Sequence, residues 1–288
     1  MNTFKPSSVP CYADLHLHST ASDGMYTPAE LSEQLTQKGV LVAALTDHDT
    51  INGFEEFQSH FSGISIIGVE LSILYDRLDF HVLGYGFDPN NDVLKERLQY
   101  YQEVRAERLN KIIVHLQALG FPLHQHDVEE EVSHSLSAGR LHIARAMIKR
   151  GWVGSIKEAF DKYLGYDKPA YVPKAKMSFE EALTLIHQAQ GIAVLAHPGK
   201  TFPKILTPLV THSDLDGIES WHPAHTLEMR KKLETIAKKH GKILTGGSDF
   251  HGNEAMSLSP GDFGIDIEHW MIVKRYLKER QTFIAPYL

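Results

Sequence analysis

The chain has a single cysteine, Cys11, among its 288 residues, so it can form no intrachain disulfide. Free thiols are typical of reducing compartments, and we therefore expect a cytoplasmic protein. Residues 1–16 contain no apolar stretch of signal-peptide length, and no hydrophobic run elsewhere approaches the length of a membrane span. These absences argue against a membrane partner.

An excess of positive charge is also absent, since 29 Lys and Arg stand against 36 Asp and Glu, for a formal net charge of −7. This balance excludes a global basic field for long duplex nucleic acid but leaves room for a local basic groove. The hydrophobic content of 42% is that of a globular protein with a sizeable core. The length fits one large α/β domain, or a core domain that carries an inserted one.

The first 90 residues alternate between strand-like and helix-like stretches. Continuous apolar runs in residues 40–50 and 64–73 predict buried strands of a parallel sheet. Residues 27–39 predict a helix, with a threonine cap, a proline at the first helical position and a closing glycine. The same alternation resumes after about residue 168. It predicts an α/β fold, either a parallel barrel or a doubly wound sheet.

A helical block interrupts this alternation. Residues 91–120 form one long helical pattern that Gly120 ends, and residues 139–151 and 155–165 predict two more helices. We therefore expect three parts: residues 11–90 as the first part of the core domain, 91–168 as an inserted helical subdomain, and 169–288 as the second part of the core.

Histidine is unusually frequent, with 18 residues, many of them beside carboxylates at the ends of apolar runs. Imidazole and carboxylate groups are ligands for divalent metals, and strand residues two apart, such as His16 and His18, point to one face. Taken alone, each group has an ordinary explanation, since His48 and His197 could be turn residues. A carboxylate that ends a buried run, as Glu70 does, needs a partner. The joint pattern predicts a metal site from His16, His18, Asp23, His48, Glu70, His81, His197, Asp249 and His251.

The ordered motifs "DLHLHSTASDG", "LTDHDT", "GVELS", "HVLGY", "LAHPG" and "GSDFHG" resemble the PHP (polymerase and histidinol phosphatase) family over essentially the whole chain. The resemblance implies a distorted seven-stranded (β/α) barrel with two or three divalent metals at its mouth, Mn²⁺ first, with Zn²⁺ or Fe²⁺ as alternatives. It would assign His16, His18, Glu70 and Asp249 to one metal, Glu70, His81 and His197 to a second, and Asp23, His48 and His251 to a third.

The helical block, with "SAGRLHIARAMIKRG" and "KPAYVP", is similar to one branch of that family, the 3′,5′-nucleoside bisphosphate phosphatases and the 5′→3′ exoribonucleases of the RNase AM type. That similarity implies hydrolysis of a nucleotide 3′-phosphate, or removal of nucleotides from the 5′ end of short RNA. A hydroxide that bridges two metals, with Glu70 between them, would be the nucleophile. The expected partner is a small nucleotide or a short single-stranded RNA end, with no obligate protein partner. The insert would cap the mouth.

Some side chains expected near the mouth are candidates for substrate binding or catalysis. His222 could protonate the leaving oxygen or donate a hydrogen bond, although an ordinary polar contact explains it equally well. Arg140 begins a predicted helix, where a phosphate is favoured, Lys168 lies in a returning loop, and Arg105 sits on an apolar stripe where its charge needs a partner. The alternative for all three is a surface salt bridge or a solvated side chain. Tyr171 could stack on a base, but a packed loop tyrosine is the simpler interpretation.

Three other functions fit the sequence less well. A histidinol-phosphate type monoesterase would use the same metals, but a simple monoester needs no second anion site in a helical insert. An amidohydrolase barrel also starts with His-x-His, but would not explain "TDHDT" together with "SDFHG". A non-catalytic regulatory metal module would not need so complete a ligand set.

Overall fold

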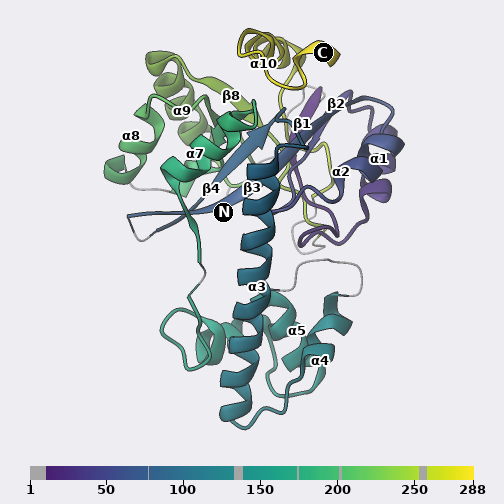
Figure 1. Ribbon diagram of the computed structural model, residues 1–288, viewed down its shortest axis with the longest axis vertical. Coiled ribbons are helices and arrows are strands. Elements are labelled where there is room, and N and C mark those ends of the chain that lie inside the picture. The colour runs from purple at the N-terminus through teal and green to yellow at the C-terminus, as the bar shows by residue number, and fades with distance from the viewer. Residues whose placement is uncertain (1–10, 77, 133–138, 174, 201–202, 253–257) are drawn as a thin grey trace.

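The computed structural model describes residues 11–76, 78–132, 139–173, 175–200, 203–252 and 258–288 (Figure 1). Its strands are β1 (Ala13–Leu17), β2 (Val42–Leu45), β3 (Ile64–Tyr75), β4 (Leu78–Tyr85), β5 (Met177–Ser178), β6 (Ile192–Leu195), β7 (Gly217–Trp221) and β8 (Ile243–Gly246). Its α-helices are α1 (Pro28–Gln37), α2 (Phe54–His60), α3 (Asp92–Ala118), α4 (Gln125–Glu129), α5 (Arg140–Lys149), α6 (Ile156–Ala159), α7 (Phe179–Gln188), α8 (Pro203–Thr211), α9 (Leu227–His240) and α10 (Ile267–Glu279).

Seven strands form one curved sheet in the order β1-β2-β3-β4-β6-β7-β8, and the two-residue strand β5 pairs with β3 off this path. The pairs β1–β2, β2–β3, β6–β7 and β7–β8 are parallel. A parallel bridge between Leu17 and Phe250 links the end of β1 to the chain just after β8, so the barrel is nearly closed. The predicted distorted seven-stranded α/β barrel is confirmed.

The distortion lies at β4, which runs antiparallel to both of its neighbours, β3 and β6. The reason is local, because only residues 76 and 77 separate β3 from β4. So short a connection makes a hairpin, whereas a parallel crossover needs a dozen residues or more. The reversal places the beginning of β4 at the end of the barrel where the parallel strands finish. His81 therefore reaches the mouth from near the start of its strand.

Helices cover the outside of the barrel and bury its outer faces. Trp270, Val273 and Leu277 of α10 pack on one set of strands and are nearly inaccessible to solvent. The apolar side of α7 joins a second cluster with β3, β4 and β6. The predicted helix near residue 28 begins at Pro28, and the Thr27 hydroxyl caps it by accepting from the backbone N–H of Glu30. Helices α8 and α10 were not anticipated from the sequence.

Helix α3 leaves the barrel (Figure 1), and its distant half carries an apolar cluster of its own. Leu94 and Leu98, near its start, belong to the barrel core. Leu109, Ile112 and Leu116 instead pack with α5 and with residues up to Ala170. This separate cluster supports an inserted helical subdomain at residues 91–168, a division that stays a prediction. At 27 residues α3 is long, yet no helix in the described ranges is apolar over a length that would cross a membrane.

Candidate metal centre

The mouth of the barrel gathers the nine side chains that the sequence suggested as metal ligands. They come from elements that are distant in the chain, and each lies in a barrel strand or in the segment that follows one. His16 lies in β1, His18 and Asp23 follow it, His48 follows β2, Glu70 lies in β3, His81 in β4, His197 follows β6, and Asp249 and His251 follow β8.

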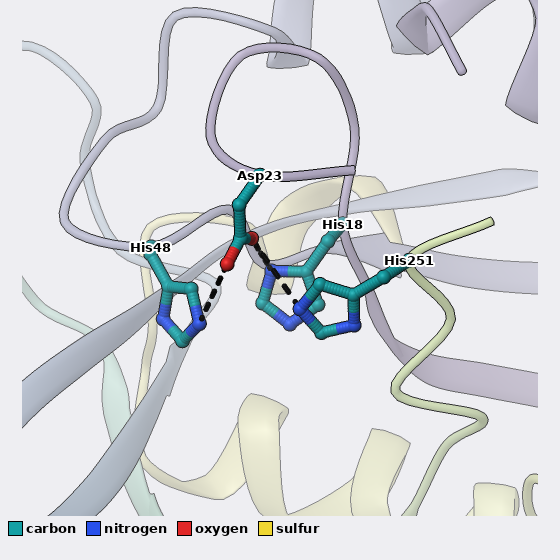
Figure 2. A group of neighbouring side chains, drawn as sticks. All are labelled: His18, Asp23, His48 and His251. Carbon is teal, nitrogen blue, oxygen red and sulfur yellow. Dashed lines mark ion pairs between the residues drawn. The ribbon is translucent and has the colours of Figure 1, made fainter. Parts of the chain in front are cut away.

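One group surrounds the carboxylate of Asp23 (Figure 2). Its Oδ1 lies 3.3 Å from Nε2 of His251 and 3.8 Å from Nδ1 of His18. Its Oδ2 lies 3.7 Å from Nε2 of His48. These are the predicted ligands of the third metal, with His18 as an additional neighbour.

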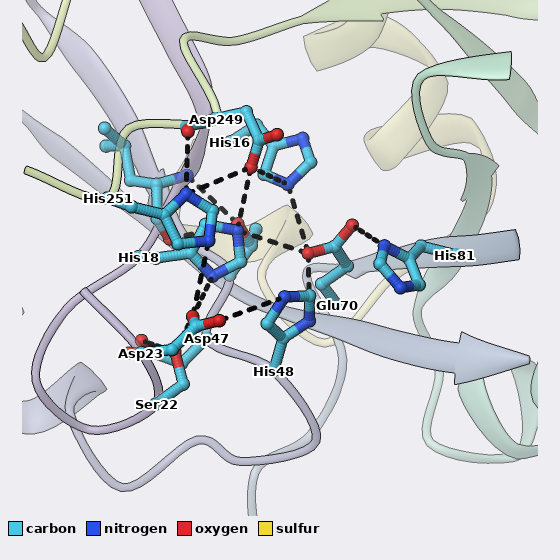
Figure 3. A network of polar contacts seen from close by, with 12 residues as sticks. His16, His18, Ser22, Asp23, Asp47, His48, Glu70, His81, Asp249 and His251 are labelled. Carbon is cyan, nitrogen blue, oxygen red and sulfur yellow. Dashed lines mark hydrogen bonds and ion pairs between the residues drawn. The ribbon is translucent and has the colours of Figure 1, made fainter. Parts of the chain in front are cut away.

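A second group is formed by His16, His18, Glu70 and Asp249 (Figure 3). The Nε2 atom of His16 is 3.3 Å from Oε2 of Glu70 and 3.3 Å from Oδ1 of Asp249. The Nε2 atom of His18 is 3.2 Å from each of the same two oxygens. Two nitrogens and two oxygens thus converge on one point, the arrangement expected around the first metal.

The other oxygen of Glu70 faces a third group. Its Oε1 lies 2.7 Å from Nδ1 of His81 and 3.0 Å from Nε2 of His197, and these two nitrogens are 3.3 Å apart. His48 approaches from the other side, with Nδ1 at 3.1 Å from Oε2 of Glu70. Glu70 is therefore common to two groups, as its predicted bridging position requires.

Several of the buried polar atoms in these groups make no hydrogen bond. Nε2 of His16, both ring nitrogens of His18, Nδ1 of His48 and Oε2 of Glu70 have no hydrogen-bond partner among the described residues. Such atoms are costly to bury unless something binds them. These ring nitrogens and this carboxylate oxygen lie close together, as His18 Nε2 and Glu70 Oε2 do at 3.2 Å, but they point to a shared central position and do not form hydrogen bonds with one another. Imidazole and carboxylate ligands without thiolates suit Mn²⁺, Zn²⁺ or Fe²⁺, so the residues fit divalent cations.

Electrostatics supports the same interpretation. Burial disfavours the imidazolium of His16, but Glu219, Glu70 and Asp249 outweigh it and raise the pKa well above its usual value. The same competition between burial and the carboxylates raises the pKa of His18 to about 10. Burial lowers the pKa of His48 to about 3. Without a cation, protons on His16 and His18 balance the carboxylates, so a metal must displace them.

We expect the apparent affinity for Mn²⁺ to rise with pH. Below its pKa of about 10, His18 holds a proton that the metal must displace. Each proton released makes the affinity rise about tenfold per pH unit in the range where the site is protonated. Calorimetric titration in buffers of different ionisation enthalpy counts the protons. A proton count of zero and an affinity that does not change with pH would contradict this expectation.

Two buried aspartates that the sequence analysis did not single out shape the ligand-bearing loops. Asp47 accepts from the backbone N–H and the hydroxyl of Ser19 at 2.7 Å each, and from Ser22 at 2.6 Å, which fixes the loop that carries Asp23. Asp14 accepts from the backbone and the hydroxyl of Ser248, next to Asp249. Burial raises the pKa of Asp14 to about 6, and these donors oppose the rise.

Glu219 of β7 is the main residue that sequence reasoning missed. Its side chain is fully buried, and its Oε1 accepts from Nδ1 of His16 at 2.9 Å. Its Oε2 accepts the backbone N–H of His197 at 2.8 Å. A carboxylate on the far nitrogen of a ligating imidazole fixes the ring and its tautomer. The signal was a glutamate inside the apolar run "DGIESW", the same feature that identified Glu70.

Close backbone approach and strained dihedrals also position the ligands. A Cβ on Gly247 would lie 2.4 Å from the backbone nitrogen of His16, so only glycine lets the strand that leads to Asp249 pass so near β1. His197 and Asp249 have positive φ angles of 26° and 49°. Non-glycine residues hold such angles only where the surrounding structure enforces them.

His222 lies at the edge of this cluster and near His16 and Glu219. Its Nδ1 accepts the backbone N–H of Ala224 at 3.0 Å, so in the neutral ring the proton is on Nε2. That Nε2 is 3.1 Å from Oδ2 of Asp249 and donates to it. His222 also lines a cavity of about 720 Å³ with His81, His197 and Asp249. The cavity is large enough for a nucleotide-sized ligand.

The three residues predicted to contact the substrate have different surroundings in the structure. Arg105 pairs with the carboxylate of Asp49, which supplies the partner that its charge requires. Arg140 donates to the carbonyl of Leu164 at 3.1 Å and packs against aromatic rings. The Lys168 side chain is exposed on the same loop. The substrate roles of these three residues stay predictions.

A nearly closed barrel whose mouth carries buried imidazole–carboxylate groups that could hold divalent metal ions defines the class of protein to compare. The family model described as the PHP domain matches residues 14–236. A 3′,5′-nucleoside bisphosphate phosphatase from Chromobacterium violaceum is 33% identical over 89% of this chain and 90% of its own. A 5′–3′ exoribonuclease from Haemophilus influenzae is 34% identical over 83% of this chain and 89% of its own.

Solved structures agree in fold. A structure described as an amidohydrolase from Chromobacterium violaceum, with bound sulfate and no metal, has a TM-score of 0.80 and 30% identity over 93% of this chain and 96% of that one. A structure from Bifidobacterium adolescentis, described as a metal-dependent phosphoesterase, has a TM-score of 0.81 and 28% identity over 96% of this chain and 98% of that one. The chain belongs to the PHP domain family, and it is a hydrolase of phosphoester bonds.

Proposed function

We propose that the protein removes the 3′-phosphate of nucleoside 3′,5′-bisphosphates and releases nucleotides from the 5′ end of short RNA. The observation that carries the proposal is Glu70, whose two oxygens reach histidines of different metal groups in a buried mouth. Relatives of similar length with these two activities support the substrate class. The single cysteine fits a cytoplasmic location, which is part of the proposal.

The residues of the mouth would hold two or three divalent cations, Mn²⁺ first. Bound there, the cations would lower the pKa of water and neutralise charge on the phosphoryl oxygens. Glu70 would contribute one oxygen to each of two neighbouring metal positions. Asp23 and His251 would be ligands at the third metal position. His222 directs its Nε2–H toward Asp249 at the wall of the cavity, where the same N–H could donate a hydrogen bond to the leaving oxygen.

The test is phosphate release by Mn²⁺-loaded protein from adenosine 3′,5′-bisphosphate, with AMP and histidinol phosphate as competing substrates. A 5′-monophosphorylated RNA oligomer is assayed in parallel for mononucleotide release. His197→Ala removes one ligand near Glu70 and controls for contaminating phosphatases. His60→Ala is the matched control, since His60 is exposed on α2 and bonds its own helix.

Release from the bisphosphate or from the RNA end, lost in His197→Ala and kept in His60→Ala, supports the proposal. Faster hydrolysis of histidinol phosphate would assign the protein to the monoesterase branch instead. A protein that binds metal and cleaves none of these substrates would contradict the proposal and favour a regulatory metal module.

A further inference from the structure

A carboxylate stands in the wall of the cavity at the metal centre. Asp79 of β4 lines this cavity together with His81, His197 and His222. Its side chain is 70% exposed, so a ligand in the cavity can reach it. Like charges repel, and a free carboxylate in a cavity that receives phosphate esters opposes the binding of such substrates. The position of Asp79 therefore calls for a chemical reason.

Lys176 holds the Asp79 carboxylate in place. The ammonium group of Lys176 pairs with Oδ1 of Asp79, and the Lys176 side chain is only 5% exposed. Lysine is almost never so deeply buried unless it is paired. Lys176 directly precedes β5, in the segment that leads from the helical block back to the barrel. This buried cation fixes the carboxylate and offsets its charge, so that Asp79 can remain beside a phosphate.

Strand β4 places Asp79 beside the second metal group. Residues two apart on a strand project from the same face, so Asp79 and His81 share one face of β4. Phe80 between them is 7% exposed and belongs to the barrel core. Side chains two apart on a strand are separated by about 6.6 Å. Since Nδ1 of His81 lies 2.7 Å from Oε1 of Glu70 (Figure 3), Asp79 is one side chain away from the predicted metal ligands.

The chemistry of a carboxylate indicates what Asp79 can recognise. An ionised carboxylate only accepts hydrogen bonds, and it has acceptor sites on both oxygens, so the contact with Lys176 leaves capacity for a further donor. In a nucleotide whose 3′-phosphate lies at the metal centre, the nearest hydroxyl is the 2′-hydroxyl on the adjacent ribose carbon. Hydrogen bonds from a hydroxyl to a carboxylate are shorter and stronger than those between neutral groups. The 2′-hydroxyl is also the group by which proteins distinguish RNA from DNA.

We propose that Asp79 accepts a hydrogen bond from the 2′-hydroxyl of the nucleotide whose 3′-phosphate is hydrolysed, and that Lys176 positions Asp79 for this contact. The inference rests on the proposed function and specifies its sugar preference. The pair selects ribonucleotides over 2′-deoxyribonucleotides, both as bisphosphates and at the 5′ end of an oligonucleotide.

The experiment compares Asp79→Ala, Asp79→Asn and wild-type protein, all loaded with Mn²⁺. The measured quantity is the ratio of kcat/KM for adenosine 3′,5′-bisphosphate to kcat/KM for 2′-deoxyadenosine 3′,5′-bisphosphate. Any change in the general attraction for phosphate affects both substrates alike and cancels in this ratio. We expect a ratio of about 10 in the wild type, because water competes for an exposed carboxylate, and of about 1 in Asp79→Ala. Asp79→Asn keeps an acceptor oxygen without the charge, so its ratio lies between the two.

Lys176→Met tests the positioning role. Without the ammonium group the Asp79 carboxylate is no longer held, so the ratio falls although Asp79 is still present. Asp161→Ala is the matched control and is expected to keep the wild-type ratio, since Asp161 is a surface carboxylate that pairs with Lys157. An equal loss of kcat/KM for both sugars in Asp79→Ala would make its role structural and overturn the proposal. An unchanged ratio in Lys176→Met would overturn the part assigned to Lys176.

Binding distinguishes a failure of this inference from a failure of the proposed function. If no bisphosphate is hydrolysed, calorimetry compares adenosine 3′-monophosphate with its 2′-deoxy analogue on the Mn²⁺-loaded protein. Tighter binding of the ribonucleotide by the wild type, lost in Asp79→Ala, upholds the contact although the proposed function fails. Equal binding of the two sugars by the wild type, or a difference that survives in Asp79→Ala, overturns the contact.

Discussion

Glu70→Gln is expected to lower phosphoester hydrolysis on the order of 10³-fold and to reduce the bound metal. Glu70 is 1% exposed, and its two oxygens lie near histidines from different strands. The nearby imidazoles oppose the effect of burial and hold the pKa of Glu70 well below its ordinary value, so it is an anion throughout the neutral range. Glutamine keeps the shape but removes the charge, and its amide presents N–H groups to ring nitrogens that need a cation.

Metal content and kcat are measured on the same preparations of the Glu70 variant. Glu181→Gln is the matched control, since Glu181 is a surface carboxylate that pairs with Arg97. Thermal unfolding in the presence of a chelator checks that the variant folds. Full metal content with undiminished activity would show that Glu70 does not connect the metal groups.

Glu219→Gln is expected to weaken metal binding about 10- to 100-fold although none of the nine predicted ligands is substituted. The Glu219 carboxylate orients His16 through Nδ1 and holds the backbone N–H of His197. It also raises the pKa of His16, so the pKa of that imidazole falls in the variant. We therefore expect fewer protons to be released per Mn²⁺ bound, although binding is weaker.

The proton count separates this positioning role from a merely structural one. A variant that is only less stable would bind metal more weakly while releasing the wild-type number of protons. Glu234→Gln, which alters a partly exposed carboxylate of α9 that pairs with Arg230, serves as the control. Mn²⁺ electron paramagnetic resonance reports the affinity, and calorimetry in two buffers reports the protons. Wild-type values for both in Glu219→Gln would refute the role.

The barrel was predictable because its signals are local. Apolar runs that end in His, Asp or Glu identify a parallel strand and its functional end together, as "VLVAALTDHDT" does for β2 and His48. The direction of β4 could not be predicted in the same way, since a short apolar run carries no direction. The two-residue connection after Tyr75 determines the direction of β4, and so short a turn is a weak signal in a sequence.

The supporting residues were less predictable for a different reason. Glu219 and His16 are 203 positions apart, and only the closed barrel brings their strands near each other. Asp14 resembles any aspartate in a strand, and what distinguishes it is the hydroxyl of Ser248, 234 positions away. Arg105 illustrates the opposite case, because its place on an apolar stripe correctly indicated a partner, and Asp49 is that partner.

The apolar cluster around Leu109, Ile112 and Leu116 has a consequence for how such a protein diversifies. That cluster is separate from the barrel clusters, whereas the nine predicted metal ligands stand on the barrel. Residues on the exposed surface of the helical block can therefore change without altering the packing beneath Glu70. In an evolutionary sense, a lineage can exchange one class of phosphoester for another while it inherits the same hydrolytic chemistry.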